Sequence, residues 1–196
     1  MNGTGPQLHA PATTTAAALT LRPWAERDLP SLVEAYDDPV MLRSTQHPVT
    51  DGAEAIRWLE ERARGWATGT RPSFAVFEGT RLVAHISLRH AGFSGTADTA
   101  EVGYWTVAAA RGRGVAPRAL EAVTAWAFSK AGMAGMAGMA GGPGLNRLEL
   151  LHQVNNPASC RVAEKAGYGY ERTLAPHPPF PLEGHLHGRV RVRAGA

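Results

Sequence analysis

One segment, from residue 99 to residue 127, constrains the fold more than any other part of the chain. A strand-like run, TAEVGYWTV at 99–107, leads through the glycine-punctuated stretch 111–117 into an amphipathic helix. Successive backbone N–H groups in a Gly-rich turn at a helix N-terminus converge on one point, and the helix dipole adds positive potential there. This layout predicts an anion site that fits a pyrophosphate group.

The residue types in the turn suit this role. Glycines allow the backbone to approach an anion with no Cβ in the way, and arginines can neutralise outer phosphate oxygens. The turn is neither a dinucleotide fingerprint nor a P-loop. A Gly-rich loop before a helix also occurs as a simple turn between two elements, with no binding role. The residues expected to bind phosphate are Arg111, Gly112, Arg113, Gly114, Val115, Ala116 and Arg118.

The remaining periodicity predicts a single α/β domain with a mixed sheet, because hairpins alternate with a β-α-β unit. A length of 196 residues and a hydrophobic content of 44% fit one buried core. Helices are expected after Asp28, at 51–68, from the Gly-rich turn onward and at 155–167. Strands are expected at 19–24, 73–78, 82–90, 99–107, 147–152, 168–174 and 188–193.

The sequence predicts one domain at 18–196, with one segment before it and one insertion within it that lack periodicity. Residues 1–17 are rich in Pro, Thr and Ala and predict a disordered lead-in, and residues 132–144 repeat G-M-A and predict a low-complexity loop insertion. No apolar run approaches 18 residues, and the start lacks a basic region followed by an apolar one. We therefore expect a cytoplasmic protein with no membrane partner.

Charge and cysteine content exclude other classes. The net charge is only +3, and outside the turn the arginines are scattered, so no nucleic-acid partner is expected. Cys160 is the only cysteine, and no Cys/His cluster with zinc spacing surrounds it in sequence, so no metal is expected. Because no histidine lies next to Cys160 in sequence, it is interpreted as a small buried hydrophobic residue.

Four ordered blocks resemble the RimJ/RimL branch of the GNAT acyltransferases. Arg111-x-x-Gly114-x-Ala116 matches the Q/R-x-x-G-x-G/A signature, and the other blocks are LTLRPW, AEVGYWTV and NNPASCRVAEKAGYGYE. The resemblance covers residues 18–193. It implies a mixed sheet of six to seven strands, flanked by about four helices and splayed between its fourth and fifth strands. The pantetheine arm of acetyl-CoA would lie in that cleft, near the Val107 backbone and Asn156.

The resemblance also implies a general base. An amine attacks a thioester only as the free base, so its ammonium form must lose a proton near neutral pH. In similar enzymes the acid of the A-E-V-G-Y-W block, here Glu101, is the proposed base, often acting through water. The alternative is a salt-bridged strand glutamate, and His85 and Glu149 are weaker candidates for the base.

A donor to the leaving thiolate is the second requirement. Many GNAT enzymes use a tyrosine on the helix after the fifth strand, but the corresponding residue here is Ala163, which leaves Ser159 of the N-P-A-S block. The alternative for Ser159 is a local hydrogen bond to the backbone. His187-Gly188 stands where many relatives have an aspartate, which puts the acceptor end of the site in doubt.

The resulting hypothesis is transfer of an acetyl group from acetyl-CoA to a primary amine, either a protein N-terminus or a small molecule. One alternative keeps the fold but uses succinyl-CoA, with an arginine on the acceptor-side helices holding the distal carboxylate. Another is a CoA-binding regulatory module without a competent base. The acceptor and the oligomeric state stay open, and a homodimer is one alternative because dimers are common among relatives.

Overall fold

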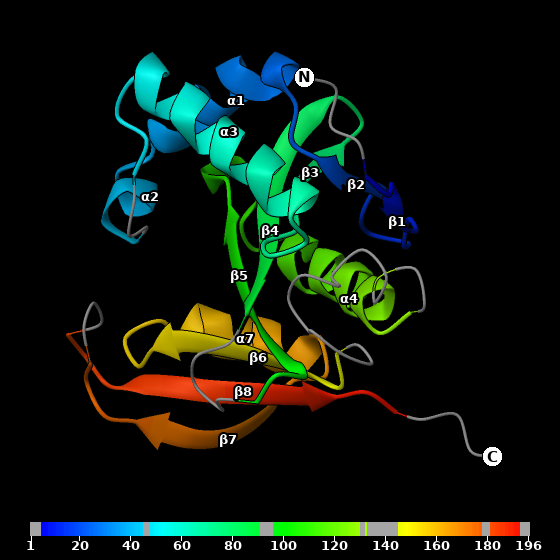
Figure 1. Cartoon of the computed structure of the whole chain (residues 1–196), viewed down its shortest axis with the longest axis vertical. Coiled ribbons are helices and arrows are strands. Elements are labelled where there is room, and N and C mark those ends of the chain that lie inside the picture. The colour runs from blue at the N-terminus through cyan, green and yellow to red at the C-terminus, as the bar shows by residue number, and fades with distance from the viewer. Residues whose placement is uncertain are drawn as a thin grey trace.

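One mixed sheet organises the chain. The computed structural model describes residues 5–44, 48–90, 96–129, 132, 145–177 and 181–192. In these residues eight strands form a single sheet in the order β1-β2-β3-β4-β5-β6-β8-β7 (Figure 1). Their bounds are β1 Leu8–Ala10, β2 Leu19–Pro23, β3 Ser73–Glu78, β4 Arg81–His90, β5 Thr99–Thr106, β6 Arg147–Gln153, β7 Gly169–Leu174 and β8 Gly184–Val190. Neighbouring strands are antiparallel except β5 and β6, which are parallel.

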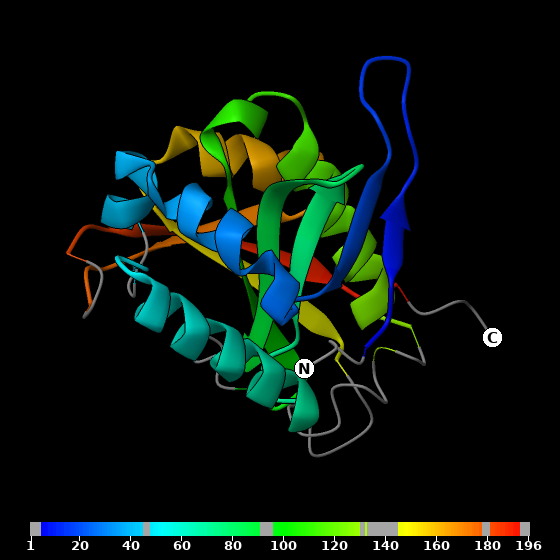
Figure 2. The same ribbon diagram turned by 90° about the horizontal axis from the view of Figure 1, so that it is seen from above.

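Helices cover both faces of the sheet. Figure 2 shows α1 and α3 on one face and α4 and α7 on the opposite face. The helices are α1 Leu29–Tyr36, α2 Pro39–Ser44, α3 Gly52–Ala67, α4 Val115–Ala127 and α7 Pro157–Lys165, with short 3-10 turns at Glu26–Asp28 and Ala108–Ala110. The sequence reasoning did not find α2, whose six residues are too few to show a helical period.

Side-chain caps fix where two helices begin. The Asp51 side chain accepts the Glu54 N–H before α3, and the Asn156 side chain accepts the Ser159 N–H before α7. Pro157 occupies the first turn of α7, where a missing N–H costs nothing. Asp28, after which the sequence also places a helix, makes no side-chain cap hydrogen bond to α1 and pairs with Arg22 instead.

Alternation along the strands divides the core in two. Ala100 and Val102 of β5 belong to the cluster under α4 and α7, whereas Trp105 belongs to the cluster under α1 and α3. Glu101 therefore faces α3, and Tyr104 faces α4 and α7. Because the two faces are separated by the sheet, the side chains of Glu101 and Tyr104 cannot contact each other.

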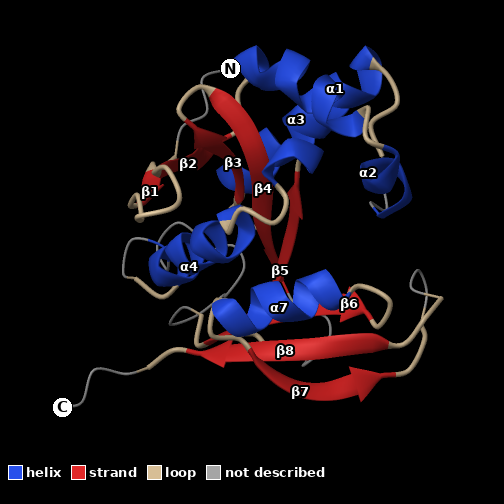
Figure 3. Ribbon diagram, turned by 180° about the vertical axis from the view of Figure 1, so that it is seen from behind, coloured by secondary structure: helices blue, strands red, loops and turns tan. Residues whose placement is uncertain are grey.

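The sheet splits between β5 and β6. The two strands pair only at Thr99–Glu101 with Arg147–Glu149, although β5 continues to Thr106 and β6 to Gln153. Beyond this fork β5 stays with β4 and β6 stays with β8, and in Figures 1 and 3 the β6-β8-β7 part runs across the direction of β4 and β5. The mixed, splayed sheet is confirmed, with eight strands in place of six or seven. Because β1 adds a strand at the start, the split falls between the fifth and sixth.

Two predictions about segments need correction. The lead-in at 1–17 includes β1, whose Leu8 and Ala10 pack on the core beside α4, but three residues are too short for a periodicity signal. The last strand lies at Gly184–Val190 instead of 188–193, because His185 and His187 gave its first half no apolar pattern. Apart from Gly132, the G-M-A repeat at 132–144 lies outside the described residues.

In the described part of the chain, no helix combines the length and the apolar character that crossing a membrane requires.

Candidate active site

Two buried carboxylates stand side by side at the fork. Glu101 on β5 and Glu149 on β6 are register partners, with exposed fractions of 7% and 1%. Opposite residues on paired strands share a face, so both side chains lie on the α3 side of the sheet. Burial of two acids at the point where the sheet opens is costly unless donors compensate. The partners of each carboxylate therefore define the site.

Glu101 is both ion-paired and placed at the fork. Arg89, its cross-strand partner on β4, donates from Nη2 to Glu101 Oε1 at 2.7 Å. The salt-bridged alternative is thus present, but the guanidinium engages only one of the two carboxylate oxygens in this contact. The Glu101 side chain keeps a second oxygen that can accept a proton.

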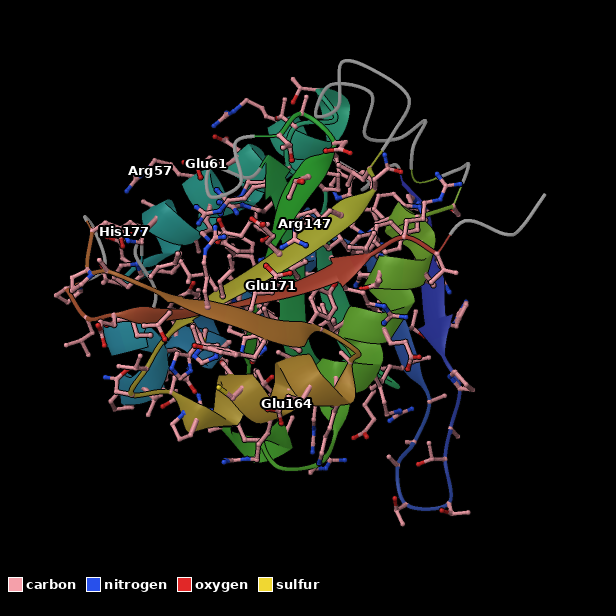
Figure 4. All side chains as sticks on the ribbon, turned by 90° about the horizontal axis from the view of Figure 1, so that it is seen from below. Arg57, Glu61, Arg147, Glu164, Glu171 and His177 are labelled. Carbon is pink, nitrogen blue, oxygen red and sulfur yellow. The ribbon has the colours of Figure 1, made fainter. Side chains whose placement is uncertain are left out.

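Glu149 has an unsatisfied oxygen. Arg147 Nε donates to Glu149 Oε1 at 3.0 Å, and Arg147 Nη2 donates to Glu171 Oε2 on β7 at 2.6 Å. Figure 4 shows Arg147 and Glu171 pointing toward one another. Glu149 Oε2 is buried and has no hydrogen-bond partner. A buried acceptor of this kind needs a donor such as water or an ammonium N–H.

His85, the other candidate base, is a core residue. Trp24 Nε1 donates to its Nδ1 at 3.0 Å, and its ring packs against Trp58 and Trp105. Burial, followed by the nearby positive charge of Arg62, lowers the pKa of His85 well below its ordinary value. A ring nitrogen already used by an indole N–H is not placed to take a substrate proton.

A hydroxyl pair lies on the opposite face of the same strand. Tyr104 Oη of β5 and Ser159 Oγ of α7 are 2.9 Å apart, and both side chains are largely buried. Burial raises the pKa of the Tyr104 phenol, so the phenol keeps its proton at neutral pH. The tyrosine was missed because it comes from β5 and not from the helix where the family pattern places one. The Ser159 N–H donates to the Asn156 side chain, while the Ser159 hydroxyl meets Tyr104 and not a local backbone group.

The Gly-rich turn is open. Gly112 and Gly114 both have φ of +74°, which favours glycine, and a Cβ at either position would meet nothing within 4 Å. Gly114 is the N-cap of α4, and because it has no side chain it cannot cap the first N–H groups of the helix. The turn borders a hollow of about 490 Å³ that is lined by Thr15, Ala16, Ala17, Glu78, Gly112, Arg113 and Gly114.

The three arginines of this region already have acceptors. Arg111 pairs with Asp38, and Arg113 donates to both oxygens of Glu78 at 2.8 and 2.6 Å. Arg118 donates from Nη2 to two backbone carbonyls of the N-terminal segment, while its buried Nη1 has no partner. An anion in the hollow would therefore meet the backbone amides first, and the arginines would serve it only by rearranging.

The backbone groups of Val107 already have partners within the chain. The Val107 N–H donates to Val83 O at 3.1 Å and its carbonyl accepts the Ala110 N–H at 2.9 Å, so little of it is left for a ligand. Because strand residues point their hydrogen-bonding groups alternately to either side, the groups of Tyr104 and Thr106 face away from β4 toward the split. The Thr106 carbonyl accepts from Arg111 Nε at 3.2 Å.

Buried arginines gather on the α3-facing side of the sheet. Arg62 of α3 has an exposed fraction of 4%, and its Nε lacks a partner, as does the buried Nε of Arg71. Burial, with the charges of Arg62 and Arg89, lowers the pKa of Arg71 to about 10. Arg62 donates from Nη2 to Glu61 and lies over the Trp58 ring. Sequence reasoning missed this cluster, since its members are separated by many residues.

Cys160 also has neighbours that the sequence did not reveal. Its Sγ lies 3.3 Å from His152 Nε2 and 3.3 Å from His185 Nδ1. The absence of an adjacent histidine in sequence was therefore no guide to its surroundings, because β6, β8 and α7 bring these side chains together.

Comparisons with known proteins agree with this geometry. A family model described as an acetyltransferase (GNAT) domain matches residues 18–169. None of the curated proteins compared with the chain matches it.

Solved structures share the fold at low identity. RimL, a ribosomal L7/L12 alpha-N-protein acetyltransferase in complex with coenzyme A, is 19% identical with a TM-score of 0.73, covering 93% of this chain and 97% of that one. The microcin C7 self-immunity acetyltransferase MccE, in complex with acetyl-CoA and AMP, is 17% identical with a TM-score of 0.73, covering 88% and 92%. RimJ from Mycobacterium smegmatis, in complex with CoA-disulfide, is 17% identical with a TM-score of 0.69, covering 94% and 86%. With the family model spanning more than half of its length, the chain belongs to the GNAT acetyltransferase family.

Proposed function

We propose that the protein transfers an acetyl group from acetyl-CoA to a primary amine by direct attack. The observation that carries the proposal is the fork between β5 and β6, which has two buried carboxylates at its closed end. The same strand β5 then leads to an open, amide-rich turn at the start of α4. One split thus joins a site suited to an ammonium with a site suited to a pyrophosphate.

Donor binding is assigned mainly to backbone groups. The amides from Gly112 to Ala116 hold the pyrophosphate at the N-terminus of α4, where the helix dipole favours an anion. Tyr104 offers its backbone groups and Thr106 its N–H to the pantetheine along the split, with the Asn156 side chain on the α7 side. Arg111, Arg113 and Arg118 contribute charge around the hollow.

At the fork, Glu101 accepts the proton of the substrate ammonium through its second oxygen, directly or through water. Glu149 Oε2 accepts a hydrogen bond from the same nitrogen and so satisfies its own buried lone pair. Acetyl-CoA supplies the acetyl group as a thioester. The C–S bond breaks as the C–N bond forms, and the second proton lost by the nitrogen goes to the thiolate, which leaves as CoA thiol. On the other face of β5, Ser159 donates a hydrogen bond to the departing thiolate while Tyr104 donates to Ser159.

A product-detecting screen tests this function. The full chain is incubated with acetyl-CoA and pooled amines, which include peptides with free N-termini, polyamines and amino metabolites. CoA thiol release and the masses of acetylated products are then followed. Acetylation of at least one amine class above the uncatalysed rate is expected. Tight CoA binding with no product from any pool would favour a regulatory CoA-binding module instead.

One observation favours a second donor. Arg62 is buried on α3 with an unpartnered Nε, and its neighbours Arg71 and Arg89 add positive charge on the Glu101 side of the sheet. This is the arginine on an acceptor-side helix that an acyl donor with a distal carboxylate requires. Comparing succinyl-CoA with acetyl-CoA for the wild type tests the alternative.

The Arg62→Gln variant then tests whether Arg62 causes any preference for succinyl-CoA. Its ratio of succinyl to acetyl transfer should fall about tenfold or more if the guanidinium binds the carboxylate. Arg57→Gln, an exposed position on the same helix, is the matched control. A wild type that uses acetyl-CoA alone excludes this donor.

A further inference from the structure

Four metal-ligating side chains gather between the sheet and α7, away from the carboxylate pair. His152 of β6 and His185 of β8 are cross-strand partners, so both face the same side of the sheet, and Cys160 of α7 packs onto that side. One ligand atom from each of the three lies within 4.8 Å of the other two. His187 joins them, with its Nε2 at 3.3 Å from His152 Nε2.

Backbone carbonyls fix the protons on two of the rings. His152 Nδ1 lies 2.9 Å from Gln153 O, and His187 Nδ1 lies 3.4 Å from Tyr168 O. A carbonyl only accepts, so each Nδ1 carries the proton and each Nε2 presents a lone pair. Oriented imidazoles of this kind are the usual state of metal-ligating histidines.

Too few protons are present to satisfy these atoms. The two Nε2 lone pairs of His152 and His187 face each other at 3.3 Å, and Cys160 Sγ faces both His152 Nε2 and His185 Nδ1. One thiol proton can serve only one of these nitrogens. His187 and His152 have exposed fractions of 0% and 9%, so water does not readily enter between their two Nε2 atoms. A cation that accepts several lone pairs at once resolves the conflict.

We propose that this cluster binds a divalent transition metal, Zn²⁺ in the first instance, through His152 Nε2, Cys160 Sγ and His185 Nδ1. Tetrahedral Zn²⁺ with Zn–N of about 2.0–2.1 Å and Zn–S of about 2.3 Å separates neighbouring ligand atoms by roughly 3.3–3.6 Å. The two 3.3 Å contacts of Cys160 are close to this spacing, and His152 Nε2 and His185 Nδ1, which lie within 4.8 Å of each other, would move to it on binding. Imidazole nitrogen with one thiolate is a ligand set that Zn²⁺ favours over Mg²⁺ or Ca²⁺.

The fourth position belongs to His187 or to a water molecule. With His187 the site is closed and structural, and with water it keeps one open position. In both cases the metal ties β6, β8 and α7 together on the far side of the fork, one residue from Ser159. The proposal does not depend on acetyl transfer, because metal binding is measured without CoA or amine.

Metal binding is tested on the full chain after chelation and buffer exchange. Zn²⁺ is titrated by calorimetry and the bound metal is counted by elemental analysis. Co²⁺ is added separately, because a thiolate-to-cobalt charge-transfer band identifies Cys160 as a ligand. We expect one Zn²⁺ per chain, a Co²⁺ spectrum of a tetrahedral site with sulfur, and an unfolding midpoint that rises on Zn²⁺ addition.

Variants separate this site from adventitious binding. Cys160→Ser and His185→Gln should each weaken Zn²⁺ binding at least 100-fold, and the Co²⁺ thiolate band should vanish in Cys160→Ser. His9→Gln on β1, an exposed histidine outside the cluster, should bind like the wild type. A comparable loss in His187→Gln assigns it as the fourth ligand, and a loss of less than about fivefold assigns water. A wild type that binds less than one Zn²⁺ or shows no thiolate band overturns the proposal, even if a variant fails to fold.

Discussion

At the start of α4 the proposed ligand-binding groups are backbone amides of five consecutive residues, Gly112–Ala116. On the α3-facing side of the sheet they are side chains from four elements, with Glu101, Glu149, Arg62 and Arg89 meeting only after folding. The first site depends on two left-handed glycines and an open hollow, and the second on compensated buried charge. The difference teaches that loss of one charged side chain should leave the first site largely intact, whereas the second should fail with a single isosteric change.

Glu101→Gln tests the second site and should have the largest effect. The amide keeps the size of the side chain and an acceptor for Arg89, but it cannot take a proton from the ammonium. Loss of general base catalysis should lower kcat about 100-fold or more, while the Kd for CoA stays within about twofold. Steady-state kinetics and calorimetry measure the two quantities. Glu121→Gln, at an exposed position on α4, is the control. An unchanged kcat in Glu101→Gln would show that Glu101 is not the general base.

Gly114→Val tests the first site. Its φ of +74° is strained for a β-branched residue, and the new Cβ would point into the space that an anion needs. The Kd for CoA should rise about tenfold or more, and Arg113→Gln should raise it only about threefold if amides dominate. Calorimetry compares both with Gly69→Val, which carries a similar strain at φ +65° after α3. A larger loss of CoA affinity in Arg113→Gln than in Gly114→Val would show that the arginine, and not the backbone amides, dominates CoA binding.

The hydroxyl pair lies on the opposite face of β5 from the carboxylates and should contribute less. One neutral hydrogen bond is worth about 1 kcal/mol, so Tyr104→Phe and Ser159→Ala should each lower kcat about fivefold. Because the two groups act as one relay, the double variant should lose little more than either single variant. Single-turnover kinetics of the three variants provide the measurement. Fully multiplicative losses would show that the hydroxyls act separately.

The smallest effect concerns stability and pH. The pKa of His85 is lowered in the fold, so below its ordinary value of 6.5 the unfolded chain binds a proton that the folded chain does not. Stability is unaffected above that pH and falls as the pH drops below it, by up to about 1.4 kcal/mol per pH unit from this group. His85→Gln keeps an acceptor for Trp24 and should flatten part of this slope in urea melts at pH 7.5, 6.5 and 5.5. An unchanged slope would show that other histidines cause the loss of stability at low pH.

The same contrast explains what the sequence could predict. The strand, Gly-rich turn and helix at 99–127 are adjacent along the chain, so local geometry alone placed the turn, and the Asp51 and Asn156 caps followed for the same reason. Tyr104 beside Ser159, Arg62 near Arg71, and Cys160 between two histidines depend on register and on helix packing. No local pattern encodes those distances, and for β1 and α2 the elements were too short to carry a period.

The most direct measurement is a CoA titration of the ¹⁵N-labelled protein followed by amide NMR. If the amides at the mouth of α4 hold the pyrophosphate, the N–H signals of Gly112 to Ala116 shift most, they saturate together, and 3′,5′-ADP moves them as well. Glu101→Gln shows the same shifts, since the base does not take part in binding. If CoA instead shifts signals elsewhere and leaves these five amides in place, the turn is not the phosphate site and the account fails.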